Sequence, residues 1–497
     1  MSPLRRHPVT LIPGDGVGPE VALATKRILD AAGARVDVAF DWEEAAAGAS
    51  VFLKGDSSGV PQETRASIER TRVALKGPLE TPVGFGEKSA NVTLRKLFET
   101  YANVRPAREL PGIPTRYKGE GIDMVIVREN VEDLYAGIEH LQTHDVAQAL
   151  KLITRKGSEK IIRFAYELAL REGRKKVTTA SKANILKFTE GMFKRIGEEL
   201  APEYAPIEAN HLIIDNVAHQ MVKDPAQFDV IVATNLHGDI ISDLASGLVG
   251  GLGFASSANY GDGVAIFEAV HGSAPKYAGK NVINPTALIL SATMMLRHLG
   301  EHDLADDVED AVLATLEAGK ALPQDVVRQQ GGDVEAATST SGFADAVIES
   351  LGTRPTGVPS AASRPRVKAI APHKRWIDGE ARLAEVGPAR VVGLDYFMQT
   401  LLSPAEAGTK LAALAGPRLE LRMLSARGVV VWPQAAPAFD HPGFFRARYV
   451  ARDPNDDLPD SELLALIERV AQLAPWAHLE KLRVWADTEG FTRAQGE

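Results

Sequence analysis

The chain of 497 residues contains no cysteine. Disulfide bonds, metal sites built on thiolates and a cysteine nucleophile are therefore excluded. A chain without disulfides is compatible with the cytoplasm, which is the compartment we expect. Long hydrophobic runs are missing as well. The most apolar helical stretch, residues 287–296, is shorter than the roughly 20 residues that a bilayer requires, so we expect no membrane span.

Positive charge is also scarce. The formal net charge is −9 at pH 7, and lysine and arginine form no long stripe. We therefore expect no nucleic-acid partner, because such proteins concentrate basic residues on one face. An anionic ligand would have to be held by arginines placed locally, against the field of the whole chain. At about 150 residues per domain, the length predicts two to four domains.

Residues 76–106 carry the densest group of polar candidates. A loop rich in proline and glycine is followed by a helical pattern that begins at Ser89. Asn91 and Arg95 are four residues apart and therefore share one face of that helix. Arg105 precedes a proline and Arg128 ends an apolar strand. Arginine suits small molecules with several carboxylates, because its planar group binds a carboxylate with two parallel hydrogen bonds.

Two aspartates, Asp239 and Asp243, follow the buried strand at residues 230–234. Their spacing puts both on one face at the start of a predicted helix. A set of carboxylates without histidine or cysteine favours Mg²⁺ or Mn²⁺. The alternative for Asp239 is a helix cap, but a cap does not account for Asp243 one turn later.

Tyr135 and Lys182 are candidates for proton transfer. A tyrosine can donate a proton near neutral pH if a cation stabilises its anion. Lys182 follows the strand at residues 177–180, at the kind of strand end where α/β sites form. The alternatives are a core tyrosine with a bonded hydroxyl and an exposed structural lysine. Between these candidates, residues 151–156 predict a strand and residues 159–170 a helix.

Several longer motifs resemble the NADP-dependent isocitrate dehydrogenases of the bacterial homodimeric type. They read KGPLETPVG at residues 76–84, SANVTLRK at 89–96, YANVRP at 101–106 and REN-EDLYAG at 128–137. The likeness runs from about residue 9 to residue 352 and is greatest for longer members with an extra C-terminal segment. The opening IPGDGVGPE fits this family and not the dinucleotide-binding pattern G-x-G-x-x-G, because Pro19 occupies the third glycine position.

The resemblance implies an α/β fold that is not Rossmann-like. It has a large domain (1–100 and 250–352), a small domain (101–132 and 177–249) and a dimer clasp (133–176). Residues 353–387, rich in proline, predict a linker. Residues 388–497 follow the order β-α-β-β-(β)-α-β, which predicts an α+β unit of ferredoxin-like type.

The resemblance also assigns roles to single residues. It implies oxidative decarboxylation of isocitrate in the tricarboxylic acid cycle, with NADP and Mg²⁺ or Mn²⁺, by a homodimer with composite sites. Tyr135 and Lys182 would be catalytic. The substrate would be held by Ser89, Asn91, Arg95, Arg105 and Arg128, and the metal by Asp215, Asp239 and Asp243. The cofactor would contact Glu80, Thr81, His271, Gly272, Ser273, Ala274, Lys276, Tyr277 and Asn284.

Within the family pattern, Lys276 and Tyr277 favour NADP, because NAD-linked relatives tend to carry an acid that repels a 2′-phosphate. Arg328 is a candidate for completing the phosphate site. Two alternatives remain. One is another β-hydroxyacid decarboxylating dehydrogenase, for isopropylmalate or homoisocitrate. The former needs an apolar pocket where Ser89 and Asn91 offer a polar one. The other is a binding protein that retains an enzyme scaffold.

Overall fold

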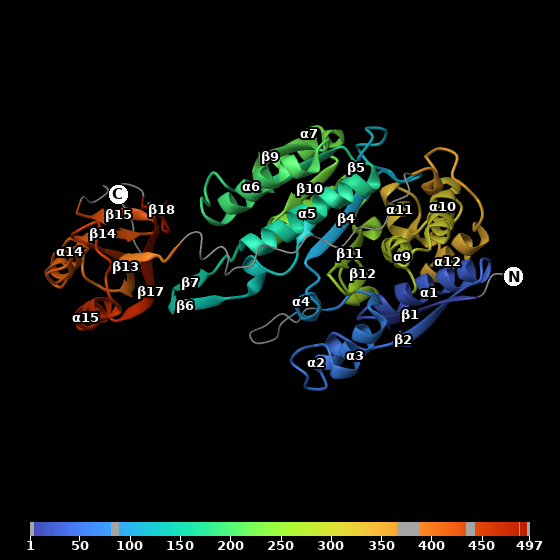
Figure 1. Cartoon of the computed structure of the whole chain (residues 1–497). Helices are drawn as coiled ribbons and strands as arrows, with labels where there is room; N and C mark the ends of the chain where they lie inside the picture. The colour runs from blue at the N-terminus through green and yellow to red at the C-terminus, as the bar shows by residue number, and fades with distance from the viewer. Residues whose placement is uncertain (1–3, 81–88, 365–386, 434–442, 487, 495–497) are drawn as a thin grey trace. The chain divides into compact units, whose positions relative to one another are not determined.

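The computed structural model describes residues 4–80, 89–364, 387–433, 443–486 and 488–494. The chain forms two compact units (Figure 1). The first comprises Met1–Ala136 and Lys151–Ala371, and the second comprises Gly137–Leu150 and Pro372–Glu497. No helix in the described part of the chain is long and apolar enough to cross a membrane. The predicted large, small and clasp domains stay predictions.

The first unit is built on a ten-stranded sheet in the order β2-β1-β3-β12-β11-β4-β5-β10-β8-β9. Its two outer parts are parallel and meet at antiparallel strands in the middle. The strands are β1 Arg5–Ile12, β2 Val38–Glu44, β3 Val73–Lys76, β4 Ala102–Arg108, β5 Asp123–Glu129, β8 Lys176–Ser181, β9 Glu208–Ile213, β10 Val230–Ala233, β11 Ser256–Tyr260 and β12 Ala265–Ala269. Apolar runs such as β10 are buried throughout, as expected of parallel strands covered on both faces.

Helices cover both faces of this sheet (Figure 1). Among the described residues, four apolar clusters result: one around α1, α9, α10 and α12, one beneath α5 and α6, one beneath α7 and α8, and one beside α3 and α4. The helices are α1 Gly18–Ala34, α2 Ala49–Phe52, α3 Gln62–Thr71, α4 Ala90–Leu97, α5 Arg155–Glu172, α6 Thr189–Leu200, α7 Ile214–Lys223, α8 Asn235–Leu248, α9 Thr286–His298, α10 His302–Ala318, α11 Gln324–Gln329 and α12 Thr340–Glu349.

The glycine-rich turn after β1 holds two distant loops together. The backbone N–H of Asp15 donates to the carbonyl O of Pro78 over 2.8 Å, and that of Val17 donates to Ser273 over 2.9 Å. Gly16 has a φ of +59°, and a Cβ there would lie 2.0 Å from the carbonyl O of Ser273. The turn therefore holds the loops after β3 and β12 together, and a side chain at position 16 would prevent this close approach.

Two predicted boundaries are wrong. Residues 151–156 do not form a strand, because α5 already begins at Arg155, where the Thr154 hydroxyl accepts the N–H of Gly157. Helix α8 begins at Asn235 with Thr234 as its N-cap residue, so Asp239 lies in the second turn. The capping alternative for Asp239 is thereby removed.

The second unit contains a six-stranded antiparallel sheet in the order β15-β14-β16-β13-β17-β18. The elements are β13 Arg390–Gln399, α14 Pro404–Ala413, β14 Leu419–Ala426, β15 Val429–Trp432, β16 Phe444–Ala451, α15 Asp460–Ala471, β17 Trp476–Trp485 and β18 Thr488–Glu489. Both helices pack on the sheet through one apolar core that includes Tyr396, Phe445 and Leu466. The ferredoxin-like prediction is confirmed, since the inner strands β14-β16-β13-β17 have that order.

The second unit also includes a hairpin from far upstream. Strands β6 (Glu139–Thr143) and β7 (Val146–Ala149) pair with each other, and β6 lies against β17. In the first unit, the beginning of the predicted linker packs on α10. The Asp310 carboxylate accepts the N–H of Ala361 over 2.6 Å, and the Glu317 carboxylate accepts the N–H of Thr356 over 2.8 Å.

Candidate active site

A cavity of about 340 Å³ opens in the first unit where the antiparallel strands meet the clamped loops. Predicted substrate residues and predicted cofactor residues line it together. The lining residues are Lys76, Pro78, Leu79, Glu80, Asn91, Arg95, Arg105, Ser257, Glu268, Ala269, Val270, His271, Gly272 and Ser273. One pocket therefore joins two sets of residues that lie almost two hundred positions apart in the sequence.

Helix α4 presents Asn91 and Arg95 to this cavity, as their four-residue spacing predicted, and Ser89 is its N-cap residue. Arg95 Nη2 lies 3.1 Å from Glu268 Oε1. The Nε atom of Arg95 and the Oδ1 atom of Asn91 are buried and have no hydrogen-bond partner among the described residues. Buried polar atoms are normally satisfied, so these two atoms fit a polar ligand in the cavity.

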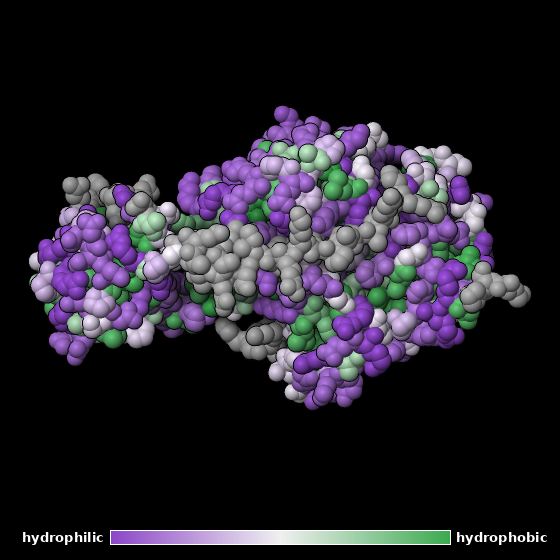
Figure 2. Space-filling view, in the orientation of Figure 1, coloured by the Kyte–Doolittle hydropathy of each residue, from purple (hydrophilic) through white to green (hydrophobic). Residues whose placement is uncertain are grey.

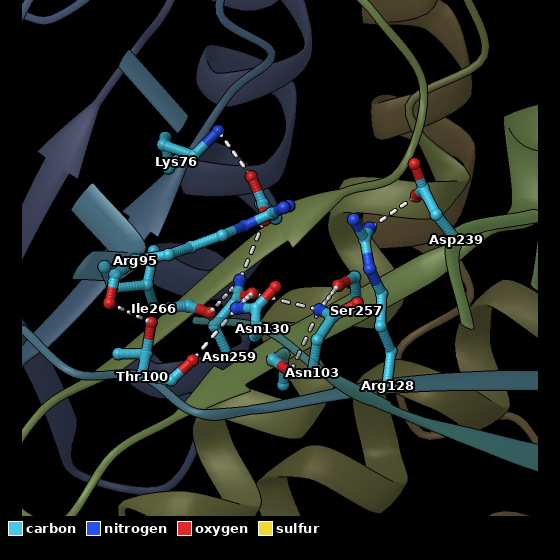
Figure 3. Close-up of polar contacts among 12 residues, drawn as sticks. Lys76, Arg95, Thr100, Asn103, Arg128, Asn130, Asp239, Ser257, Asn259 and Ile266 are labelled. Atoms are coloured by element: carbon cyan, nitrogen blue, oxygen red, sulfur yellow. Dashed lines mark hydrogen bonds and ion pairs between the residues drawn. The ribbon is translucent and has the colours of Figure 1, made fainter. Parts of the chain in front are cut away.

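Arg105 on β4 and Arg128 at the end of β5 are both buried. Arg105 Nη1 lies 3.2 Å from Asp239 Oδ1 and 3.3 Å from Asp243 Oδ1. Arg128 pairs with Asp239 as well (Figure 3). Burial, together with the charges of Arg95 and Arg105, lowers the pKa of Arg128 to about 9. Three neighbouring cations in a buried place favour an anionic ligand.

Tyr135 follows β5 in a short 3₁₀ turn, where its hydroxyl donates to Asp239 Oδ2 over 2.5 Å. The guanidinium of Arg128 lies over the ring, 4.9 Å from its centre. Burial and the bond to Asp239 raise the pKa of Tyr135, so it stays protonated at neutral pH. Gly238 permits this packing, because a Cβ there would lie 2.7 Å from the Arg128 side chain.

Asp239 and Asp243 present their carboxylates to the same guanidinium nitrogen of Arg105. Burial and the charge of Asp239 raise the pKa of Asp243, despite the opposing arginines. A divalent cation would relieve that repulsion, so the donor set fits Mg²⁺ or Mn²⁺. Within the described residues of a single chain, no group of three or more His, Asp or Glu could hold a metal ion.

Asp215 and Lys182 form a separate pair in this chain. Lys182 Nζ lies 2.6 Å from Asp215 Oδ1, in the first turn of α7, and this contact lowers the pKa of Asp215. The backbone N–H of Lys182 donates to the buried carboxylate of Glu190 over 3.0 Å. The third predicted metal ligand and the predicted catalytic lysine are thus brought to each other, and not to Asp239 and Asp243.

The predicted cofactor residues lie on the loops after β3 and β12. His271 Nε2 is buried and has no partner in the described part of the chain, and Asn284 donates to Asp325 over 3.1 Å. The 3₁₀ turn Pro275–Tyr277 carries Lys276 Nζ 5.0 Å from the centre of the Tyr277 ring. Thr81 lies outside the described residues. The backbone N–H of Glu80 donates to Asp15 over 2.8 Å.

A family model described as isocitrate/isopropylmalate dehydrogenase matches residues 8–347. The chain belongs to this family. A second model, the C-terminal domain of bacterial isocitrate dehydrogenase, matches residues 389–497. The family thus accounts for both the ten-stranded sheet and the ferredoxin-like sheet.

Relatives within this dehydrogenase family cover the chain from end to end. The isocitrate dehydrogenase [NADP] of Thermus thermophilus is 55% identical over 99% of this chain and 96% of its own length. That of Rickettsia felis is 38% identical over 99% of both chains. A crystal structure of a Thermus thermophilus protein superposes with a TM-score of 0.90 at 55% identity, over 99% of this chain and 96% of the other.

Sequence reasoning missed one pair in this dehydrogenase site. Lys76 and Glu268 are both buried in the cavity wall, with Lys76 Nζ 2.6 Å from Glu268 Oε2. Burial opposes the charge of Glu268, but Lys76 and Arg95 outweigh it and hold its pKa far below its usual range. A signal was available, because each charge stands at or near the end of an otherwise apolar strand.

Proposed function

We propose that the chain catalyses the NADP-dependent oxidative decarboxylation of isocitrate to 2-oxoglutarate and CO₂. The observation that carries the proposal is the cavity itself, where buried arginines and the cofactor loops form one wall. The proposal is supported by the full-length relatives, which are named isocitrate dehydrogenase [NADP].

The substrate is a tricarboxylate, and the arginines meet its carboxylates. Arg95, Arg105 and Arg128 offer three guanidinium groups, and buried polar atoms of Asn91 and Arg95 have no partner among the described residues. These contacts would hold the substrate beside the loops that carry His271 and Glu80, which line the same cavity.

The metal ion would be held by Asp239 and Asp243 of one subunit and by Asp215 of the other. When bound, the ion supplies a Lewis acid at the C2 hydroxyl, and the cofactor supplies the hydride acceptor. Lys182, assisted by the carboxylates that would hold the metal, would help to remove the proton of the C2 hydroxyl. Tyr135, protonated at neutral pH, delivers a proton to C3 after CO₂ has left, and the neighbouring Arg128 stabilises the phenolate.

A homodimer with composite sites brings Lys182 and Asp215 to the other residues. The proposal is supported by exposed apolar side chains beside both groups. Ile185 is 64% exposed, three residues after Lys182, and Ile240 is 59% exposed, next to Asp239. Hydrophilic residues make up most of the coloured surface in Figure 2. Leu186 and Phe188, each 39% exposed, lie in the same loop as Ile185, so the apolar side chains after Lys182 form a group. Such a group is typical of a protein contact, and C₂ symmetry would then complete two identical sites.

Turnover of isocitrate with NADP and Mg²⁺ tests the proposed function. We expect reduction of NADP, measured by absorbance at the wavelength of NADPH, and equimolar 2-oxoglutarate. Isopropylmalate and homoisocitrate are the matched controls. A pocket wall of arginines and Asn91 disfavours an alkyl group, so we expect little turnover of isopropylmalate. Faster turnover of either control than of isocitrate would contradict the proposal.

Cofactor choice can be tested at Lys276 and Tyr277. Lys276→Asp combined with Tyr277→Ile should raise the KM for NADP roughly ten- to a hundredfold, because a charge-assisted contact with the 2′-phosphate is lost. The KM for NAD, which has no 2′-phosphate, is the internal control and should change far less. Equal changes for both cofactors would show that these residues do not contact the phosphate.

A further inference from the structure

Asn259 lies buried on β11, and its side-chain amide has four hydrogen-bond partners (Figure 3). Its Nδ2 donates to Glu268 Oε1 over 2.8 Å and to the carbonyl O of Ile266 over 3.2 Å. Its Oδ1 accepts from Nδ2 of Asn103 over 3.0 Å and from Nδ2 of Asn130 over 2.9 Å. These bonds use the full capacity of an amide.

The partners of Asn259 reach two of the arginines in the cavity wall. On one side, Arg105 Nε donates to Asn103 Oδ1 over 2.7 Å. On the other side, Arg95 Nη2 lies 3.1 Å from the Glu268 oxygen that accepts from Asn259. A continuous series of polar contacts therefore runs from Arg105 through the buried side chains of Asn103, Asn259 and Glu268 to Arg95, which is partly exposed.

The direction of each bond in this series is fixed from both ends. A guanidinium can only donate, so Asn103 must turn its oxygen toward Arg105 and its nitrogen toward Asn259. At the other end, the Glu268 carboxylate is paired with two cations and can only accept. Asn259 must therefore direct its oxygen to Asn103 and its nitrogen to Glu268. A side chain at position 259 that cannot donate a hydrogen bond would interrupt this series of hydrogen bonds.

We propose that Asn259 is a positioning residue that sets the spacing of Arg105 and Arg95 for the carboxylates of the substrate. It touches neither substrate nor cofactor and acts through Asn103 and Glu268. The role rests on the proposed function, in which these two arginines bind isocitrate. An amide suits the place because it donates on one side and accepts on the other without adding charge to a buried region.

The test is Asn259→Asp, which keeps the shape but replaces the donor by a carboxylate oxygen facing Glu268. We expect the KM for isocitrate to rise tenfold or more and kcat to change less than about threefold. The reason is that the arginines hold the carboxylates equally before and during the reaction, so uniform binding is lost. Asn259→Ser, which retains one hydroxyl, should give a smaller rise.

Ser291→Ala is the matched control. The Ser291 hydroxyl on α9 lies 2.8 Å from the carbonyl O of Glu268 and accepts the N–H of Ser257 over 3.1 Å. It links the backbones of the same two strands, β11 and β12, but makes no hydrogen bond with the side chains of Asn103, Asn259 or Glu268. We expect it to lower the melting temperature while leaving the KM for isocitrate unchanged.

Three results would decide against the proposal. One is an unchanged KM in folded Asn259→Asp, or in Asn259→Ser if the first variant does not fold. Another is a fall in kcat at constant KM. The third is an equal rise in KM for Ser291→Ala, which would show that Asn259 only stabilises the packing of the strands. A wild-type chain that does not turn over isocitrate would overturn the proposed function, and this role with it.

Discussion

Two inactive variants should restore activity to each other when they are refolded together. Tyr135→Phe removes the proton donor that one subunit contributes to a site. Lys182→Met removes the lysine that the other subunit contributes to the same site. In a dimer with composite sites, a heterodimer of these variants contains one site with both defects and one site with neither. Each variant homodimer should be at least a hundredfold less active than the wild-type dimer. Each heterodimer should have about half of the wild-type activity.

The structure gives this expectation a physical basis. Lys182 Nζ is paired with Asp215, and within the described residues of one chain no third carboxylate joins Asp239 and Asp243. Subunits carrying different affinity tags allow the heterodimer to be isolated before its activity is measured. The control is a refolded mixture of two differently tagged Tyr135→Phe chains, which should stay inactive. Isolated heterodimers without activity would show that Lys182 works within its own subunit.

Removal of divalent cations should abolish turnover. Asp239 and Asp243 bring two carboxylates to one nitrogen of Arg105, and burial together with the charge of Asp239 raises the pKa of Asp243. Activity in excess EDTA should fall more than a hundredfold and return with added Mg²⁺ or Mn²⁺, because the Lewis acid at the C2 hydroxyl is lost.

A ligand variant links this loss to the site. Asp243→Asn removes one charge, so half-maximal activity should require at least tenfold more Mg²⁺. Asp345→Asn is the matched control, because Asp345 is exposed and pairs only with Arg27 among the contacts described. It should leave the Mg²⁺ requirement unchanged. Full turnover of the wild-type chain in EDTA would contradict the metal assignment.

Local patterns were sufficient to predict much of the architecture. The apolar run of β10 and the four-residue spacing of Asn91 and Arg95 are patterns within a few consecutive residues, so they can be recognised in the sequence. The order of elements after residue 388 was equally legible, because each strand and helix of the ferredoxin-like unit has its own amphipathic pattern. The start of α5 could not be predicted, because it is set by a single hydrogen bond between the Thr154 side chain and the backbone N–H of Gly157.

Partners that meet across the sheet could not be predicted from the sequence. Lys76 and Glu268 stand on adjacent parallel strands, but only the strand order β3-β12 reveals it. Asn103 and Asn259 meet because β4 and β11 are antiparallel neighbours in matching register. The pairing of Lys182 with Asp215 likewise depends on how β8, β9 and α7 lie together, which no spacing along the chain encodes.

The hairpin Gly137–Leu150 has a consequence for the order in which the chain is made. It belongs to the same compact unit as the C-terminal sheet, although roughly 240 residues lie between the hairpin and the first strand of that sheet, β13. Its partner strand β17 begins roughly 325 residues after the hairpin ends. At a synthesis rate of about 5–20 residues per second, the hairpin waits about 16–65 seconds before β17 can follow. The nascent chain therefore carries β6 without its neighbour β17 for that time. During translation, the second unit is the last part of the protein to become complete.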